Sequence, residues 1–194
     1  MTSNLTLYAV NESTGSQIWQ FYAGPGSAVG GGSQPNLAVS GNRVFVAFAT
    51  DSMGRAGLCA VNARTGKLEW SWAIYNDSGP VTSYADNGPT IAGGDVIMGE
   101  QDSNGAGHVG YVVDLDATTG AVIWMIGECG DNPANNLCYT VSSSPAAVAK
   151  GVFYVGAGGD GKFFNFTAGT CAHSMTDGSV LWCHQSNNTE DAVS

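Results

Sequence analysis

Basic residues are scarce in this sequence: six Lys and Arg stand against sixteen Asp and Glu, which gives a net charge of −10. A surface of this sign repels the phosphate backbone, so the composition argues against a nucleic-acid-binding protein. Long hydrophobic runs are also missing, although hydrophobic residues make up 43% of the chain. Because a transmembrane helix needs about 20 consecutive apolar residues, we expect no membrane span.

Signals for helices are almost absent, since no stretch places apolar residues at helical spacing between two caps. The first residues, MTSNLTLYAV, lack the basic segment and apolar core of a signal peptide. Either the protein is cytosolic, or the numbered chain is a mature or partial one. What the sequence does contain is 28 glycines together with many Ser, Thr and Asn, the composition of short strands joined by turns. We therefore predict an all-β fold.

One phrase recurs four times: a short apolar run, a turn that ends in Gly, and a Trp four residues after that Gly. The copies are LYAVNESTGSQIW, LCAVNARTGKLEW, VVDLDATTGAVIW and, more loosely, TDGSVLW. The glycines lie 51, 54 and 58 residues apart. The repeat residues are Gly15, Trp19, Gly66, Trp70, Gly120, Trp124, Gly178 and Trp182. A fixed period in this range indicates a propeller or solenoid, whose units cannot bury their apolar faces alone.

Each copy predicts a β-hairpin. Asn or Asp begins the turn because its side chain accepts hydrogen bonds from backbone amides, and Gly ends it where φ is positive. Between copies lie a strand of small residues and an apolar strand, for example Pro35–Val39 and Val44–Phe48. Four antiparallel strands of this kind form a propeller blade. We predict one all-β, propeller-type domain of about three and a half blades: a half blade at 1–22, blades at 34–73 and 84–126, and a blade with an insertion at 141–186.

The pattern apolar-x-Ala/Asp-x-Asn/Asp-x-x-Thr-Gly-x-x-x-Trp resembles the tryptophan-docking repeat of the pyrroloquinoline-quinone-type β-propellers. The resemblance covers nearly the whole chain, and the fourth copy departs from it by carrying Asp177-Gly178 instead of Thr-Gly. It implies that the Thr-Gly turns and the tryptophans hold adjacent blades together. Propellers of this family usually close with six to eight blades, so something must complete the apolar edge at Leu5–Val10. Either further blades or other copies of the chain would do so.

The same family includes quinone-dependent alcohol and sugar dehydrogenases. Resemblance to those enzymes would imply a quinone over a calcium ion, a catalytic Asp and often a disulfide between adjacent cysteines. This sequence has neither an adjacent cysteine pair nor a haem attachment motif. The candidate carboxylates are Asp102, Asp114, Asp116 and Asp160. Asp116 holds the turn position of the repeat, Asp114 shares its strand, and Asp160 lies in a Gly-rich turn, so structural roles are favoured over catalysis.

Metal ligation is equally weak in the sequence, because the histidines His108, His173 and His184 have no ligand spacing. No dense acidic cluster offers the six to eight oxygens that calcium takes. We therefore expect no catalytic residue, no metal site and no cofactor, with pyrroloquinoline quinone and calcium as the alternative.

Cysteines and glycosylation motifs favour a secreted protein. Cys129 and Cys138 bracket a polar loop, Cys171 and Cys183 flank the fourth turn, and Cys59 is left over in an apolar strand. These positions predict two disulfides and one buried thiol, which indicates an oxidising, extracellular location. Five sequons predict N-glycans, unless their Asn and Thr serve only as turn residues. They begin at Asn4, Asn11, Asn76, Asn165 and Asn187.

Together these features favour a non-catalytic, secreted propeller-repeat glycoprotein that acts as a structural, self-assembling or binding module, in a filament or a surface layer. One alternative is a fragment of a quinone-dependent alcohol or sugar dehydrogenase. The other is a scaffold for the assembly of a protein complex, as the family's non-enzymatic members imply.

Overall fold

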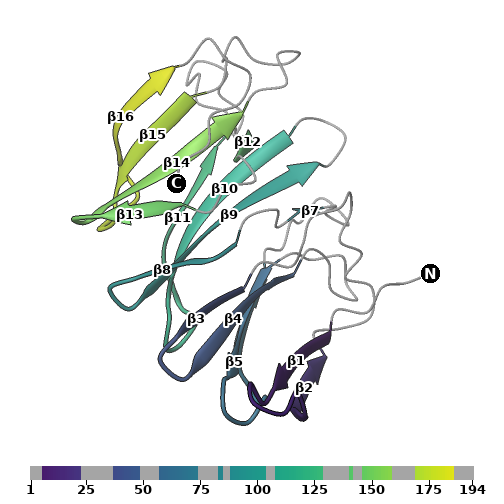
Figure 1. The fold of residues 1–194 in the computed structure, drawn as a ribbon. Coiled ribbons are helices and arrows are strands. Elements are labelled where there is room, and N and C mark those ends of the chain that lie inside the picture. The colour runs from purple at the N-terminus through teal and green to yellow at the C-terminus, as the bar shows by residue number, and fades with distance from the viewer. Residues whose placement is uncertain are drawn as a thin grey trace.

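The computed structural model describes residues 6–22, 37–48, 57–73, 83–84, 88–103, 108–128, 140–141, 146–158 and 169–185. These residues form β-strands and turns without a helix, and the strands make four antiparallel sheets that follow one another along the chain (Figure 1). The predicted all-β, blade-like architecture is confirmed. None of the described residues belongs to a helix that is long and apolar enough to cross a membrane.

Each sheet is one blade or part of one. Blade 1 is the hairpin of β1 (Thr6–Val10) and β2 (Gln17–Tyr22). Blade 2 contains β3 (Leu37–Ser40), β4 (Arg43–Phe48), β5 (Gly57–Asn62) and β6 (Leu68–Ala73). Blade 3 contains β7 (Ser83–Tyr84), β8 (Thr90–Ala92), β9 (Asp95–Ser103), β10 (His108–Asp116) and β11 (Val122–Glu128). Blade 4 contains β12 (Thr140–Val141), β13 (Ala147–Ala149), β14 (Val152–Gly158), β15 (Gly169–Ser174) and β16 (Val180–Gln185).

The first strand of blades 3 and 4 differs from the single small-residue strand predicted for each blade. In blade 3 it is split into β7 and β8, which both pair with β9. In blade 4 it is split into β12 and β13, which both pair with β14. In blade 3 the described Pro89 comes directly before β8. Because proline has no N–H to donate to a sheet, it favours such an interruption at a sheet edge.

The hairpin turns of blades 1 to 3 have the predicted chemistry, whereas the turn of blade 4 begins with Ser174, whose hydroxyl accepts a hydrogen bond from the Thr176 amide at 3.2 Å. In blade 2 the carbonyl of Asn62 accepts a hydrogen bond from the Gly66 amide at 2.9 Å. The side-chain oxygen of Asn62 accepts two more, from the amides of Arg64 at 3.1 Å and Thr65 at 3.0 Å. Asn11 and Asp116 bind the corresponding amides of blades 1 and 3. Gly66 has a φ of +69°, which L-residues with a side chain rarely adopt.

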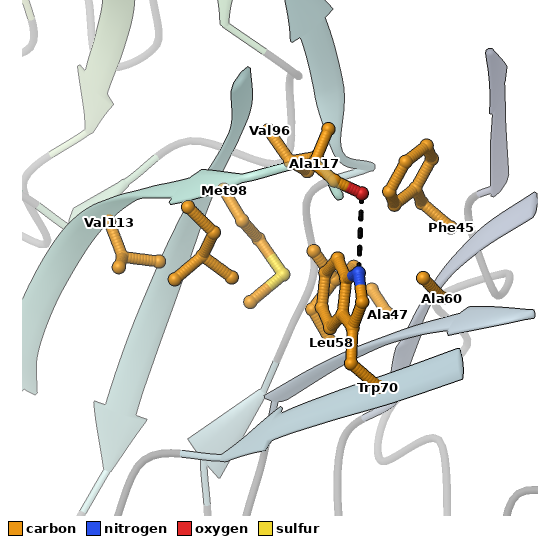
Figure 2. Packing of buried hydrophobic residues seen from close by; sticks show 10 residues of the cluster. Phe45, Ala47, Leu58, Ala60, Trp70, Val96, Met98, Val113 and Ala117 are labelled. Atoms are coloured by element: carbon orange, nitrogen blue, oxygen red, sulfur yellow. Dashed lines mark hydrogen bonds between the residues drawn. The ribbon is translucent and has the colours of Figure 1, made fainter. Parts of the chain in front are cut away.

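The hydrophobic core lies between blades. Alternate residues of a strand point to opposite faces of its sheet, so blades 2 and 3 each contribute apolar side chains to both of their neighbours. The layer between blades 2 and 3 contains Phe45, Leu58, Trp70, Val96, Met98, Val113 and Leu115 (Figure 2). The layer between blades 3 and 4 contains Ile97, Val112, Trp124, Phe153, Val155 and Cys171. A third layer joins Leu7, Trp19 and Phe21 of blade 1 to Val44, Val46, Cys59 and Val61 of blade 2.

Candidate functional site

Every repeat tryptophan that has a following blade in the described chain binds to the hairpin turn of that blade. The Nε1–H of Trp19 donates to the carbonyl of Ala63 at 2.9 Å. Trp70 donates in the same way to Ala117 at 3.2 Å, and Trp124 to Met175 at 2.9 Å. Figure 2 shows the Trp70 bond bridging two blades. Sequence reasoning placed these indoles between blades but could not identify the carbonyls that they reach.

The glycine that ends the receiving turn lies directly under the indole ring. A Cβ atom added to Gly66 would lie 2.7 Å from Trp19, and one added to Gly120 would lie 2.6 Å from Trp70. At Gly178 the nearest ring atom, from Trp124, would be 2.8 Å away. We call this glycine, together with the carbonyl three residues before it, the socket of a blade. The socket therefore needs glycine for two reasons, the positive φ and the close approach of the ring.

We call the contact between a repeat tryptophan and the socket of the next blade a joint. The first and the last blade each carry one partner of a joint whose other partner is not among the described residues. At Gly15 the φ of +68° repeats the socket geometry, but no described atom lies within 4 Å of an added Cβ. At the other end Trp182 is 50% exposed, whereas Trp70 and Trp124 are each 9% exposed. The Trp182 ring contacts Tyr154 of its own blade. Blade 1 thus has an open socket, and blade 4 has an indole that no described socket covers.

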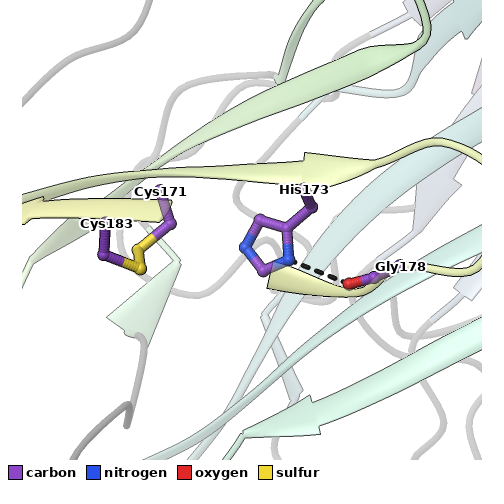
Figure 3. Close-up of a disulfide and its surroundings, with 4 residues drawn as sticks. All are labelled: Cys171, His173, Gly178 and Cys183. Carbon is purple, nitrogen blue, oxygen red and sulfur yellow. Dashed lines mark hydrogen bonds between the residues drawn. A yellow bond between two sulfur atoms is a disulfide. The ribbon is translucent and has the colours of Figure 1, made fainter. Parts of the chain in front are cut away.

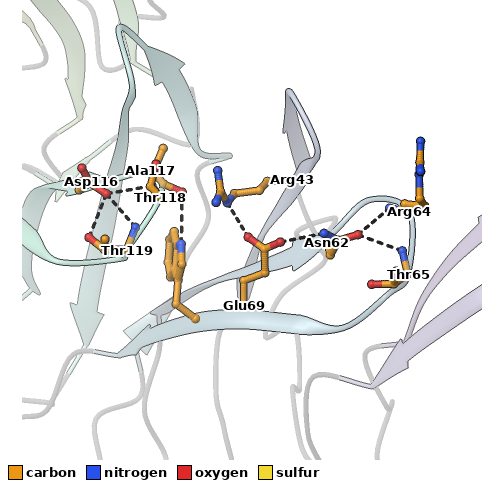
Figure 4. A network of polar contacts seen from close by, with 10 residues as sticks. Arg43, Asn62, Arg64, Thr65, Glu69, Asp116, Ala117, Thr118 and Thr119 are labelled. Carbon is orange, nitrogen blue, oxygen red and sulfur yellow. Dashed lines mark hydrogen bonds and ion pairs between the residues drawn. The ribbon is translucent and has the colours of Figure 1, made fainter.

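Polar side chains around the turns form hydrogen bonds and an ion pair with one another (Figure 4). The Nε–H of Arg43 donates to Oε2 of Glu69 at 2.6 Å, and Nδ2 of Asn62 donates to Oε1 of the same carboxylate at 2.8 Å. These two hydrogen bonds, that of Asn62 first, lower the pKa of Glu69. These contacts connect the turn to β4, and each oxygen of the Glu69 carboxylate accepts a hydrogen bond. Since the pair is partly exposed, its contribution to stability is modest.

The candidate carboxylates occupy different environments. Asp116 accepts hydrogen bonds from the hydroxyl of Thr119 at 2.9 Å and from the amides of Thr119 and Thr118 at 2.7 and 2.9 Å, which lower its pKa. This is the turn role that the sequence predicted. Asp114 instead is fully buried, and neither of its carboxylate oxygens has a hydrogen-bond partner. Asp160 and the side chain of Asp102 lie outside the described residues.

The buried Asp114 was missed as a special residue by sequence reasoning, which treated it as part of its strand. A signal was available in the repeat itself. The equivalent positions in the other three copies are Ala9, Ala60 and Ala172. One charged residue at a position that is otherwise alanine marks a departure from the structural pattern.

Cys171 and Cys183 form a disulfide between β15 and β16, where they are directly opposite each other in the strand register (Figure 3). Cys59 is a free, buried thiol, and burial raises its pKa to about 12, which makes it a poor nucleophile. Cys129 and Cys138 lie outside the described residues. The disulfide is consistent with an oxidising location, extracellular or periplasmic.

Reduction of the Cys171–Cys183 disulfide is expected to lower the free energy of unfolding by about 3 kcal/mol, because the bond closes a short loop in the unfolded chain. Urea unfolding with and without dithiothreitol measures this loss. A double variant, Cys171→Ala with Cys183→Ala, serves as the control and should not respond to the reductant. An oxidised wild-type protein that is equally indifferent to dithiothreitol would contradict the prediction.

The histidines do not come together in the described structure. The Nδ1 of His173 is 3.0 Å from the carbonyl of Gly178, so Nδ1 carries the proton that is donated (Figure 3). His184 is exposed on β16, and the side chain of His108 lies outside the described residues. Among the described residues no group of three or more His, Cys, Asp or Glu is placed to hold a metal ion.

The described sequon belongs to a turn. Asn11 is exposed and its side-chain oxygen binds the amides of Ser13 and Thr14. Asn4, Asn76, Asn165 and Asn187 lie outside the described residues. Occupancy of all five sequons by glycans therefore stays a prediction.

The blade geometry agrees with comparisons to known proteins. A sequence profile of PQQ-like repeats, described as "outer membrane protein assembly factor BamB", matches residues 3–194. The chain belongs to this family. The predicted resemblance to pyrroloquinoline-quinone-type propellers is thereby confirmed. Comparison with curated protein sequences found no match.

Solved structures share the fold of this PQQ-like repeat chain. A quinohemoprotein alcohol dehydrogenase from Comamonas testosteroni is 20% identical, with a TM-score of 0.71 over 95% of this chain and 32% of that one. The quinohemoprotein alcohol dehydrogenase ADHIIG from Pseudomonas putida HK5 is 20% identical, with a TM-score of 0.68 over 93% of this chain and 31% of that one. A subtype N10 neuraminidase-like protein of a little yellow-shouldered bat isolate is 10% identical, with a TM-score of 0.56 over 91% of this chain and 47% of that one. At these identities the likeness shows the fold alone, and the chain spans about a third of the two dehydrogenases.

Two predictions made from the sequence are corrected by these findings. The reading as a non-catalytic, secreted structural glycoprotein is wrong, because the family match and the two dehydrogenase structures favour the alternative of a dehydrogenase fragment. The expectation of no cofactor is wrong for the same reason, since the neighbours are quinohemoproteins. Both errors came from treating the absence of catalytic motifs in a repeat sequence as an indication of function.

Proposed function

We propose that this chain forms part of the propeller of a quinone-dependent alcohol or sugar dehydrogenase. The observation that carries the proposal is the shared fold with two quinohemoprotein alcohol dehydrogenases, over 93% and 95% of the chain. The membership in the PQQ-like repeat family supports it. The role of the described residues is to hold blades at fixed positions, since a catalytic site needs a rigid frame.

Further blades complete the ring in this proposal. The exposed Trp182 and the open socket at Gly15 are the two halves of a joint that is closed at three places within the chain. A blade that follows blade 4 would supply a socket for Trp182. A blade that precedes blade 1 would supply an indole for Gly15 and the carbonyl of Glu12. The span of about a third of each dehydrogenase agrees with such additional blades.

The cofactor in this proposal is pyrroloquinoline quinone with calcium. The described residues alone do not fit it: Asp116 and Glu69 are bound in turn contacts, and no cluster of metal-ligating side chains is described. Its ligands would therefore come from other segments or from further blades. When bound, the quinone supplies the electron acceptor for alcohol oxidation. The Cys171–Cys183 disulfide supports an oxidising location, outside the cytoplasm.

The natural protein that carries this chain tests the proposal. Purified protein is freed of metal with a chelator, then incubated with pyrroloquinoline quinone in the presence of calcium chloride or of the chelator. Dye-linked oxidation of primary alcohols is followed together with the absorbance of bound quinone. We expect saturable quinone binding and alcohol oxidation that both need calcium. No quinone binding at any calcium concentration would overturn the proposal.

A second candidate is a role in the assembly of a protein complex. The observation that favours it is the description of the matching family, an outer membrane protein assembly factor. The same experiment separates the two, because an assembly factor would bind no quinone and oxidise no alcohol.

A further inference from the structure

Asp114 lies in the layer between blades 3 and 4. In the strand register it is opposite Ile97 of β9 and Trp124 of β11, and cross-strand neighbours share one face of the sheet. Ile97 and Trp124 pack against blade 4, where the Trp124 ring stacks on Phe153 with 5.1 Å between ring centroids. The carboxyl group of Asp114 therefore occupies the apolar face through which the two blades contact each other.

This position is apolar in the other copies. Ala60 and Ala172 are equivalent to Asp114 and, like it, have an exposed fraction of 0%. An ionised carboxylate in such a place loses its hydration and needs a hydrogen-bond donor or an opposite charge in return. Neither Oδ1 nor Oδ2 of Asp114 has a hydrogen-bond partner, and both are inaccessible to solvent.

Among the described residues, the titratable groups around Asp114 offer no compensating positive charge. On its own blade, Asp95 of β9 is a second carboxylate. On the facing blade, His173 of β15 stacks on the other member of the ring pair, Phe153, at 4.7 Å. Burial lowers the pKa of His173, so this ring stays neutral at neutral pH. Burial and the charge of Asp95, in that order, raise the pKa of Asp114 to about 7.

We propose that Asp114 is a pH-sensitive lock between blades 3 and 4. With its proton, the carboxyl group is neutral and packs in the apolar layer. Loss of the proton places an uncompensated charge there, and the docking of blade 4 on blade 3 weakens. The inference is independent of the proposed dehydrogenase activity, because it concerns the joint between two described blades.

The direction of the effect follows from the two states of the chain. The folded protein holds the Asp114 proton up to about pH 7, whereas an ordinary Asp releases it near 3.8. Protonated Asp114 contributes fully to the stability of the folded protein below the ordinary Asp pKa of 3.8. This contribution is lost as the pH rises through the pKa of about 7 in the folded protein. The difference corresponds to about a thousandfold rise in the unfolding equilibrium constant between pH 4 and pH 8. The lowered pKa of His173 acts with the opposite sign, so a variant must isolate the Asp114 contribution.

The first test compares wild type with Asp114→Asn by urea unfolding from pH 4 to pH 8. Asparagine keeps the shape of the side chain but cannot ionise. We expect the ratio of the two unfolding constants, wild type over variant, to rise by about a thousandfold and to level off above pH 7. Asp116→Asn is the matched control: its exposed carboxylate titrates below this range, and Asn stands at that position in blades 1 and 2. Parallel profiles for wild type and Asp114→Asn would overturn the proposal.

A second measurement tests whether the pH-dependent destabilisation occurs at the contact between blades 3 and 4. The indole N–H groups of Trp124 and Trp70 make the same kind of bond to the next blade, so Trp70 is an internal reference. In wild type, hydrogen exchange of the Trp124 indole, divided by that of Trp70, is expected to increase between pH 5 and pH 8. Asp114→Asn should remove the increase. Carboxyl ¹³C resonances provide a readout that needs no variant: an Asp114 midpoint near 4 instead of near 7 would contradict the proposal.

Discussion

Replacement of Trp70 by alanine is expected to lower the free energy of unfolding by about 3–5 kcal/mol, the range for loss of a buried aromatic side chain. The indole is 9% exposed, contacts the ring of Phe45 at a centroid distance of 5.9 Å, and donates its N–H to the carbonyl of Ala117 in the next blade. The substitution leaves a cavity between blades 2 and 3 and removes the partner of that carbonyl. Urea unfolding monitored by far-ultraviolet circular dichroism measures the loss.

Trp182→Ala is the matched control for this variant. Trp182 holds the same place in its repeat but is 50% exposed. Its replacement in this chain is expected to cost less than about 1 kcal/mol, as for other exposed sites. Equal losses in the two variants would show that the tryptophans stabilise their own blades and not the contact with the next one.

The second large effect is expected for Gly120→Ala, with a loss of about 3 kcal/mol composed of two parts. One part is backbone strain at a φ of +72°, and the other is the clash of the new methyl group with the Trp70 ring, 2.6 Å away. Gly15→Ala has nearly the same backbone strain, at +68°, without an atom in the way. It should therefore lose only about 1–2 kcal/mol.

The difference between these two glycine variants isolates the packing of the indole on the socket. It is measured by urea unfolding of both variants under one set of conditions. If Gly15→Ala and Gly120→Ala lost the same free energy, the positive φ alone would explain the glycines. The close approach of the ring would then have no energetic weight.

Much of the fold was predictable because its determinants are local. The side chain at the start of each turn, Asn or Asp in blades 1 to 3 and Ser174 in blade 4, and the glycine at its end specify the hairpin from within a few residues, as Asn62 and Gly66 show. The period of the repeat then indicates blades. The contact from Trp70 to the Ala117 carbonyl was not predictable, because it depends on how one sheet lies on the next. The interruption between β7 and β8 likewise depends on pairing with β9.

The site was harder to predict than the fold. Repeat residues such as Trp124 and Gly178 recur because every joint needs them, and they carry no information about a cofactor. Residues that bind a cofactor in one place have no reason to recur with the period of the blades. Asp114 could have been singled out from the repeat, since it stands where Ala60 and Ala172 are buried, but its burial and lack of hydrogen-bond partners became visible only in the structure.

The quinone content of the natural protein tests the proposed function most directly. Protein purified without added cofactor is denatured in acid, and the released pyrroloquinoline quinone and calcium are quantified against the protein. We predict one quinone and at least one calcium ion for each complete propeller that contains this chain. A folded protein with its Cys171–Cys183 disulfide intact but without quinone, and unable to take it up, would contradict the assignment to a quinone-dependent dehydrogenase.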